Sequence, residues 1–177
     1  DPNDLHTFLP LYDVATDYGP VKNPCPRAVT DHVIKTDRDD NPDRIIAHYM
    51  PTHTPYIAKA RGDGTIDILN EERPSVGKEG FVAYLDNLRW ALNEVEVLLS
   101  NVDRRRVIIS ADHGENFRLR WFRTAHTNGM IDPSVRRVPW VETSASDERT
   151  YKPELSAYDE IKSTPHEEML EALGYLG

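Results

Sequence analysis

The sequence predicts an α/β domain with a mixed, largely parallel β-sheet flanked by helices. Two short apolar runs, residues 44–50 and residues 107–111, have the length and composition of buried strands. Between them, residues 78–102 carry apolar side chains at helical spacing. A strand, a long helix and a second strand form a βαβ unit, whose two strands are normally parallel.

Residues 1–43 are expected to form an irregular lead-in, because they are rich in Pro, Asp and Asn and show little periodicity. One short helix is predicted around residues 27–35, after the prolines that would break a helix. These prolines are Pro20, Pro24 and Pro26. The α/β core portion is predicted to span residues 44–143, and its first strand, residues 44–50, ends at Pro51.

The middle of the chain is predicted to be a loop followed by a long helix. The loop, residues 56–70, has a turn at Gly62-Asp63-Gly64. The helix, residues 78–102, has a single apolar stripe, which we expect to pack on one face of the sheet as core. The stripe consists of Phe81, Leu85, Leu88, Leu92, Val95 and Leu99.

The last part of the chain is predicted to add one strand and one helix. Residues 138–143 have the composition of a strand, and Pro139 places it at a sheet edge or at a strand start. Residues 144–177 are interpreted as a polar tail segment and a terminal helix. That helix is expected to begin at Thr164-Pro165-His166-Glu167, which combines a threonine cap with proline at the first position and glutamate at the third.

The composition is acidic and argues against several classes of protein. The chain has 177 residues and a formal net charge of −9, with 30 Asp and Glu against 21 Lys and Arg. Nucleic-acid binding is not expected, because it needs a basic stripe. No apolar run approaches the about 20 residues of a membrane span, and no secretion leader is recognised. Many carboxylates, with more arginine than lysine, favour a halophilic protein, and the acidic composition of a GC-rich genome stays open as the alternative.

The most informative motif is Asp112-His113-Gly114-Glu115, which directly follows the predicted strand at residues 107–111. In open α/β sheets, ligands bind beyond the carboxyl ends of the strands. A carboxylate and an imidazole at that place suit a shared metal ion, and the glycine lets the backbone turn sharply. The same residues also fit a simple strand-to-loop corner in which Asp112 caps the next turn.

Further histidines lie near this motif or near the first strand. In a parallel sheet, His53 and the Asp112–His113 pair would emerge at the same edge, and His126 follows a short loop later. Imidazole together with carboxylate suits Zn²⁺ or Mn²⁺, and carboxylate alone suits Mg²⁺ or Ca²⁺. Structural readings stay open: His48 is expected to be a core residue of its strand, and His126 also fits a loop side chain.

Several of these motifs, in this order, resemble the sulfatases of the alkaline-phosphatase superfamily, and they look similar to the haloarchaeal branch. The resemblance covers roughly residues 44–177. It implies a hydrolase of sulfate esters or phosphate esters, of whose largely parallel sheet this chain holds the carboxyl-terminal portion. The matching segments are residues 44–56, 107–115, 125–126, 135–141 and 170–176.

The resemblance also implies the roles of four site residues. Asp112 matches the metal-binding aspartate of the family, and His113 matches the neighbouring residue, a metal ligand in the phosphate-cleaving relatives. His53 and His126 match catalytic-site histidines near the sulfuryl or phosphoryl oxygens. One divalent metal ion is implied, Ca, Mn, Mg or Zn, with a sulfated or phosphorylated small molecule or glycan as substrate.

The chain departs from the family because it shows neither the amino-terminal aspartate pair nor the nucleophile. Cys25-Pro26-Arg27 is similar to the nucleophile motif, but its proline and arginine come one residue too early. Cys25 is therefore not expected to be catalytic. As the single cysteine, it also excludes an internal disulfide.

Three hypotheses about function stay open. The chain is part of a sulfatase-like hydrolase whose nucleophile lies elsewhere, a non-catalytic binding or structural module, or one subunit of a split enzyme. The third hypothesis predicts an exposed apolar sheet edge, because unpaired edges promote association, and it implies a partner chain or a homo-oligomer. The residues expected at that edge are Ile45, Ile46, Val107 and Ile109.

Overall fold

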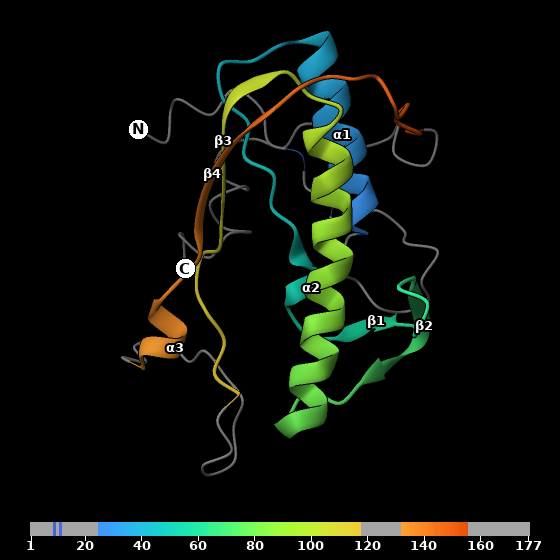
Figure 1. The fold of residues 1–177 in the computed structure, drawn as a ribbon, viewed down its shortest axis with the longest axis vertical. Coiled ribbons are helices and arrows are strands. Elements are labelled where there is room, and N and C mark those ends of the chain that lie inside the picture. The colour runs from blue at the N-terminus through green and yellow to red at the C-terminus, as the bar shows by residue number, and fades with distance from the viewer. Residues whose placement is uncertain (1–8, 10, 12–24, 118–131, 156–177) are drawn as a thin grey trace.

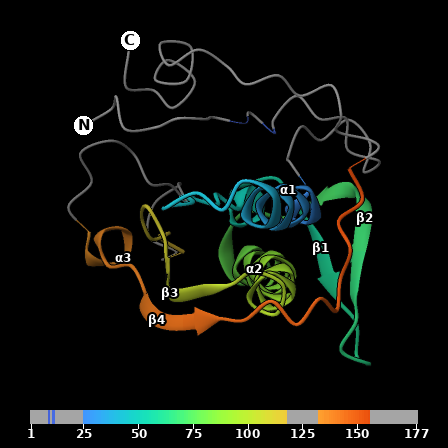
Figure 2. The same cartoon turned by 90° about the horizontal axis from the view of Figure 1, so that it is seen from above.

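The computed structural model describes residues 9, 11, 25–117 and 132–155 of the chain. Two helices, α1 (Pro26–Asp39) and α2 (Gly77–Leu99), pack against each other at its centre. Two small antiparallel sheets, each of two strands, lie on opposite sides of this helix pair (Figures 1 and 2). None of the described helices is long and apolar enough to cross a membrane.

The first sheet is a hairpin of β1 (Tyr56–Ala60) and β2 (Ile66–Arg73), which packs on α2. The prediction of a loop at residues 56–70 is therefore wrong, although the turn within it is confirmed. Gly64 has a φ of 86°, which favours glycine, and the Arg61 amide donates to the Thr65 carbonyl oxygen at 2.8 Å. The hairpin forms because the first residues of β1 are apolar enough to be buried under α2.

The second sheet pairs β3 (Arg104–Ser110) with β4 (Trp140–Ala145). The strands predicted at residues 107–111 and 138–143 are thus confirmed as elements. β4 begins directly after Pro139, which has no N–H group for the ladder. A single helical turn, α3 (Pro133–Arg136), precedes β4.

The predicted largely parallel sheet is wrong. Both sheets are antiparallel, with Val107 opposite Thr143 in the second sheet, and neither contains a βαβ crossover. Of the two strands expected to pair in parallel, only β3 forms a ladder. Residues 44–49 carry no strand hydrogen bonds and lead into a 3₁₀ turn, η3 (Met50–Thr52). A parallel sheet needs two such strands side by side, and the described residues provide one.

The predicted long helix is confirmed as α2, but the face that it buries was predicted wrongly. Of the expected apolar stripe, Phe81 and Leu92 are exposed and the other members are only partly buried. Neither of the two described sheets covers the stripe, and α2 packs by its opposite face against α1 and β1. The buried side chains on that face include small, polar and apolar ones: Ala83, Asp86, Asn87, Trp90, Ala91, Glu94 and Leu98.

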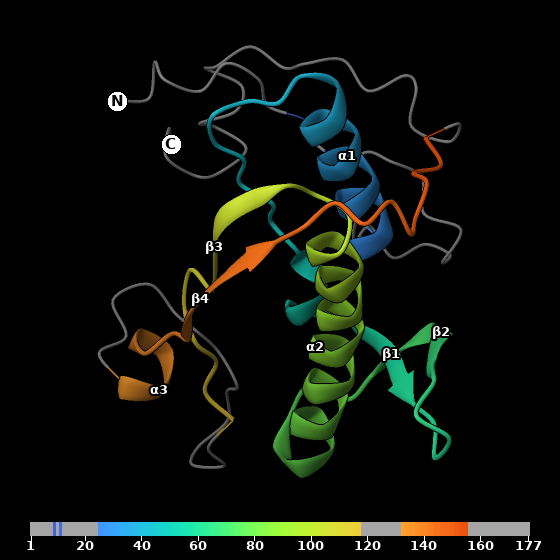
Figure 3. The same cartoon turned by 45° about the horizontal axis from the view of Figure 1, so that its top comes forward.

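The predicted short helix around residues 27–35 is confirmed as α1, which is 14 residues long. Beyond β4, the chain crosses the end of α2 next to α1 (Figure 3). There the Ser146 amide donates to the Leu99 carbonyl oxygen at 3.1 Å, and the Tyr151 amide donates to Asn101 Oδ1 at 2.8 Å. This crossing closes the small cluster of Ile34, Leu98 and Val102. The predicted terminal helix lies outside the described residues.

Candidate metal centre

Asp112 and His113 lie directly after β3, as the sequence predicts, and their side chains turn toward each other. Asp112 Oδ2 lies 3.6 Å from His113 Nε2. Both side chains reach solvent, with 68% of the aspartate and 37% of the histidine exposed. An ion pair this exposed contributes little to stability, so the pair is accessible without holding the fold together.

The hydrogen bond at the other ring nitrogen fixes which atom of His113 carries the lone pair. His113 Nδ1 lies 2.9 Å from the Gly114 carbonyl oxygen, which can only accept, so Nδ1 donates. In the neutral imidazole, Nε2 is then the lone-pair nitrogen. A lone-pair nitrogen and a carboxylate oxygen therefore lie 3.6 Å apart, and both are atoms that a cation attracts.

The separation of these two atoms fits a shared metal ion. Two ligand atoms about 2.1 Å from one tetrahedral metal ion are about 3.4 Å apart. The observed 3.6 Å between Asp112 Oδ2 and His113 Nε2 is close to that distance. The other carboxylate oxygen, Oδ1, accepts the His113 amide at 2.9 Å and so holds the carboxylate in place. Asp112 and His113 are therefore suitably spaced to bind one divalent cation as two neighbouring ligands.

Gly114 fixes the loop that carries the pair. Its amide donates to the Val135 carbonyl oxygen at 2.7 Å. A Cβ atom at this position would lie 2.1 Å from the Ser134 carbonyl oxygen, so only glycine allows this approach. On the other side of the contact, Asp132 caps α3 by accepting the Ser134 amide at 2.8 Å. The two interpretations of this motif, a strand-to-loop corner and a pair of metal ligands, are therefore compatible with each other.

The contacts that hold α3 against the metal-ligand loop were not predicted from the sequence. Asp132 and Ser134 position α3 against the loop, and Asn116 Nδ2 donates to Asp132 Oδ2 at 3.4 Å. The signal for this cap was present in Asp132-Pro133-Ser134, because a capping aspartate followed by proline is typical of a helix start.

The remaining predicted site residues are not brought to the pair within the described residues. His53 is exposed at the end of η3, where its Nδ1 lies 2.6 Å from the Thr54 carbonyl oxygen. His126 lies outside the described residues. No three His, Cys, Asp or Glu side chains converge on one point in the described ranges, so the pair supplies two ligands of an incomplete site.

Two other predictions about single residues are settled by burial. His48 is exposed, so the prediction that it is a core residue is wrong; its segment forms no ladder and turns this side chain outward. Cys25 is 6% exposed and packs with Ala28 and Ile57. A thiol buried in this cluster cannot reach a substrate, which agrees with the expectation that Cys25 is not catalytic.

A hollow of about 470 Å³ lies beside the metal-ligand loop. Phe117 forms one wall, with its ring 5.3 Å from that of Phe81 and 4.9 Å from that of Tyr84. Burial and the nearby Glu115 carboxylate raise the pKa of Tyr84, so this phenol stays neutral. The hollow is lined by Gly77, Lys78, Phe81, Glu115, Asn116, Phe117 and Ser134.

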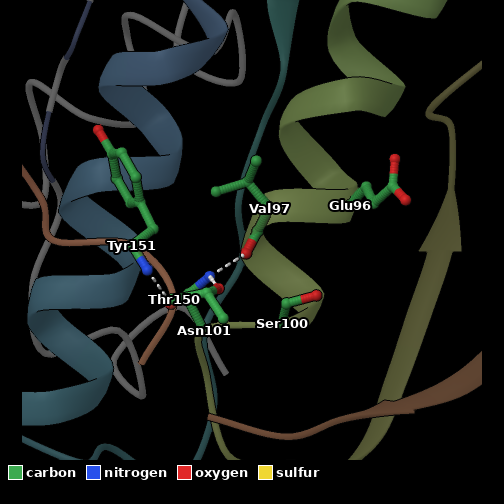
Figure 4. A pocket seen from close by; sticks show the side chains of 6 residues that line it. All are labelled: Glu96, Val97, Ser100, Asn101, Thr150 and Tyr151. Atoms are coloured by element: carbon green, nitrogen blue, oxygen red, sulfur yellow. Dashed lines mark hydrogen bonds between the residues drawn. The ribbon is translucent and has the colours of Figure 1, made fainter. Parts of the chain in front are cut away.

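A second hollow, of about 290 Å³, lies at the end of α2 and is structural (Figure 4). Its polar groups satisfy one another. Asn101 Nδ2 donates to the Val97 carbonyl oxygen at 2.9 Å and to Thr150 Oγ1 at 3.0 Å, while Asn101 Oδ1 accepts the Tyr151 amide. Asn101 therefore ties the crossing segment to α2, and this hollow offers no converging groups for chemistry.

The interface of α1 and α2 contains a buried ionic group that the sequence did not predict. Arg27 Nη2 donates to Glu94 Oε1 at 2.8 Å, and Arg27 Nε lies 2.7 Å from Glu94 Oε2 as an ion pair. The guanidinium also lies 4.7 Å from the ring centre of Tyr151. Burial raises the pKa of Glu94 and that of the neighbouring Asp31. These groups hold α1 and α2 together and are not part of the metal-ligand loop.

Comparisons with protein-family models, with curated proteins and with solved structures give no match for this chain. The sulfatase resemblance therefore depends on the motifs alone, and the function is inferred from the Asp112–His113 geometry.

Proposed function

We propose that this chain supplies two ligands, Asp112 and His113, of the divalent metal site in an enzyme that hydrolyses sulfate or phosphate esters. The observation that carries the proposal is the 3.6 Å approach of Asp112 Oδ2 to His113 Nε2, with Nδ1 of the same ring donating to a carbonyl oxygen. This arrangement presents a carboxylate oxygen and an imidazole lone pair to the same cation. The exposure of the pair and its rigid loop support the same role.

The proposed roles follow from the chemistry of each side chain. A divalent cation held by Asp112 and His113, of the Ca, Mn, Mg or Zn type, would polarise the ester oxygens. His53 and His126 would hydrogen-bond the anionic ester or protonate the leaving oxygen, as imidazoles do near neutral pH. The substrate class is a sulfated or phosphorylated small molecule or glycan. The nucleophile and the other ligands would come from outside the described residues or from a partner chain.

A second candidate is a non-catalytic module that binds such an ester without cleaving it. It requires no nucleophile, and Cys25, the described residue that comes nearest to the family's nucleophile motif, is buried and out of register with that motif. The two candidates share the metal pair and differ in turnover. An assembled complex that binds 4-nitrophenyl sulfate or phosphate but releases no 4-nitrophenol would favour the binding module.

Titration with Mn²⁺, followed by electron paramagnetic resonance, tests the metal pair. Asp112→Asn and His113→Gln each remove one ligand, and we expect either change to weaken Mn²⁺ binding by about tenfold or more. Asp63→Asn is the matched control, because Asp63 is an exposed turn carboxylate that accepts hydrogen bonds from Thr65. Equal Mn²⁺ affinity in Asp112→Asn and in the unaltered chain would refute the proposal.

A further inference from the structure

Two neighbouring extended segments lack a strand partner on at least one side. β3 pairs only with β4 among the described residues, and residues 44–48 make no backbone hydrogen bond with any of them. Their starts lie together, because Arg104 Nη1, at the start of β3, donates to the Pro42 carbonyl oxygen at 2.6 Å. In Figure 1 the chain then descends from Pro42 on the side of β3 that faces α2, opposite β4.

The side chains of residues 44–48 alternate as they do in a strand. Ile45 and Ala47 are half-buried, whereas Ile46 is 84% exposed. On the neighbouring strand, Ile108 is 41% exposed between the half-buried Val107 and Ile109. A period of two is the pattern of a strand that rests on the molecule by one face. The segment therefore has the burial pattern of a strand but makes no ladder with the described residues.

Unpaired backbone groups favour an extended polypeptide as the occupant. A row of open N–H and C=O groups is a template for another strand, and a two-stranded sheet is marginally stable without a third strand or a covering helix. Small molecules and helices cannot satisfy such a row. Strand addition to an open edge is a common mode of peptide recognition.

We propose that the open edge of β3 and the extended residues 44–48 together bind a β-strand of a different polypeptide. That strand is apolar in its middle, to match the exposed Ile46 and Ile108, and acidic at the end beside Arg44 and Arg105. Both arginines are exposed, and neither forms an ion pair with a described residue. The proposal deepens the expectation of a partner chain in the proposed function, but it does not depend on metal binding.

Charge favours a different polypeptide over a second copy of this chain. Each copy carries a formal net charge of −9, so two copies repel each other at moderate salt. A short partner strand meets only the local charges, which include the open Arg44 and Arg105 side chains.

Amide hydrogen exchange tests the strand site, with EDTA present so that metal binding plays no part. The probes are acetylated ten-residue peptides with two glutamates followed by alternating apolar residues and threonine, each with a lysine-for-glutamate counterpart. At ten times its dissociation constant, a glutamate peptide should slow exchange of residues 44–48, and of the β3 amides that point away from β4, about tenfold. The lysine counterpart should bind at least tenfold more weakly.

Two variants separate the strand site from general apolar binding. Ile46→Lys should weaken the glutamate peptide at least tenfold, and Leu92→Lys should not, although Leu92 is an exposed apolar residue of α2. Equal effects of the two variants would overturn the proposal. Protection of only one of the two segments, or of neither by any peptide, would also overturn it.

Amide exchange of the chain without added peptide also tests the proposal. Protection of residues 44–48 that rises with chain concentration would identify a second copy as the occupant. Protection in the dilute chain would show that a segment of the same molecule fills the edge. Either result would overturn the proposal, whereas loss of Mn²⁺ binding in the separate titration would leave it standing.

Discussion

Replacement of Gly114 by alanine tests whether the metal-ligand loop is held against α3. The new Cβ atom would lie 2.1 Å from the Ser134 carbonyl oxygen and 3.0 Å from the Arg137 carbonyl oxygen. Both are backbone atoms, so neither can rotate away as a flexible side chain would. The loop must move, and the 2.7 Å hydrogen bond from the Gly114 amide to the Val135 carbonyl oxygen is lost.

The cost of Gly114→Ala follows from these two effects. Overpacking costs about 1–3 kcal/mol. The lost hydrogen bond adds about 1 kcal/mol. A loss of about 2–4 kcal/mol lowers the melting temperature by roughly 5–15 °C in a domain of this size. Calorimetry and urea unfolding measure it, and Gly62→Ala is the matched control, since no atom lies within 4 Å of its added Cβ. Equal stability of the two variants would refute the described contact.

Four further predictions concern the Arg27–Glu94 pair, the pH dependence due to Asp31, the buried Asn87 and the exposed His53. Arg27→Met should lower the free energy of unfolding, measured with urea, by about 2–3 kcal/mol. The loss should be smaller than for a fully buried ion pair, because Arg27 is partly exposed. Adding Glu94→Leu should recover most of the lost stability, because it removes the carboxylate left without its partner. Because burial raises the pKa of Asp31, the folded chain binds its proton more tightly than the unfolded chain, so the contribution of Asp31 to stability should rise as pH falls from neutral toward the ordinary aspartate pKa of 3.8. Asp31→Asn should flatten that rise, and an unchanged pH profile would contradict the account. Asn87→Ala should cost about 2–4 kcal/mol, because Asn87 bonds both the Ala58 amide and the Pro51 carbonyl oxygen in the interior. Exposed His53→Ala should stay within about 0.5 kcal/mol of the unaltered chain.

Local elements were predictable because their signals are local. The spacing of apolar residues identified α2, and the apolar run before Asp112 identified β3. The hairpin at β1 and β2 was missed because the turn at residues 62–64 was read without the short strands beside it. Alternation in β2 is weak, since its second half, Asn70 to Glu72, is exposed.

The parallel sheet was predicted wrongly because pairing is a non-local property. An apolar run shows that a segment can be a strand, but a ladder needs a second strand in register. Residues 44–49 were predicted to form a buried strand, but they form no strand and find no ladder partner among the described residues. The predicted sheet was also expected to cover the apolar stripe of α2. Because the described residues do not form that sheet, the stripe is partly exposed. In its place, α2 buries Asn87 and Glu94, whose partners lie far away in sequence.

Only the part of the site made by neighbours in the sequence was predictable. Asp112 and His113 come together because they are neighbours at the end of one strand, and Gly114 holds them there. The tautomer of His113 depends on the carbonyl oxygen that its ring meets, which no sequence pattern reveals. The expected convergence of His53 depended on the parallel sheet, and the described residues do not bring His53 to the Asp112–His113 pair.

The most direct test of the metal pair is the place where Mn²⁺ binds, measured by paramagnetic line broadening of the histidine ring signals. Substoichiometric Mn²⁺ should broaden the His113 signals first, while those of His32 and His48 stay sharp, and Asp112→Asn should abolish the difference. Broadening of all three histidines to the same extent would place Mn²⁺ diffusely on the acidic surface and contradict the proposed site.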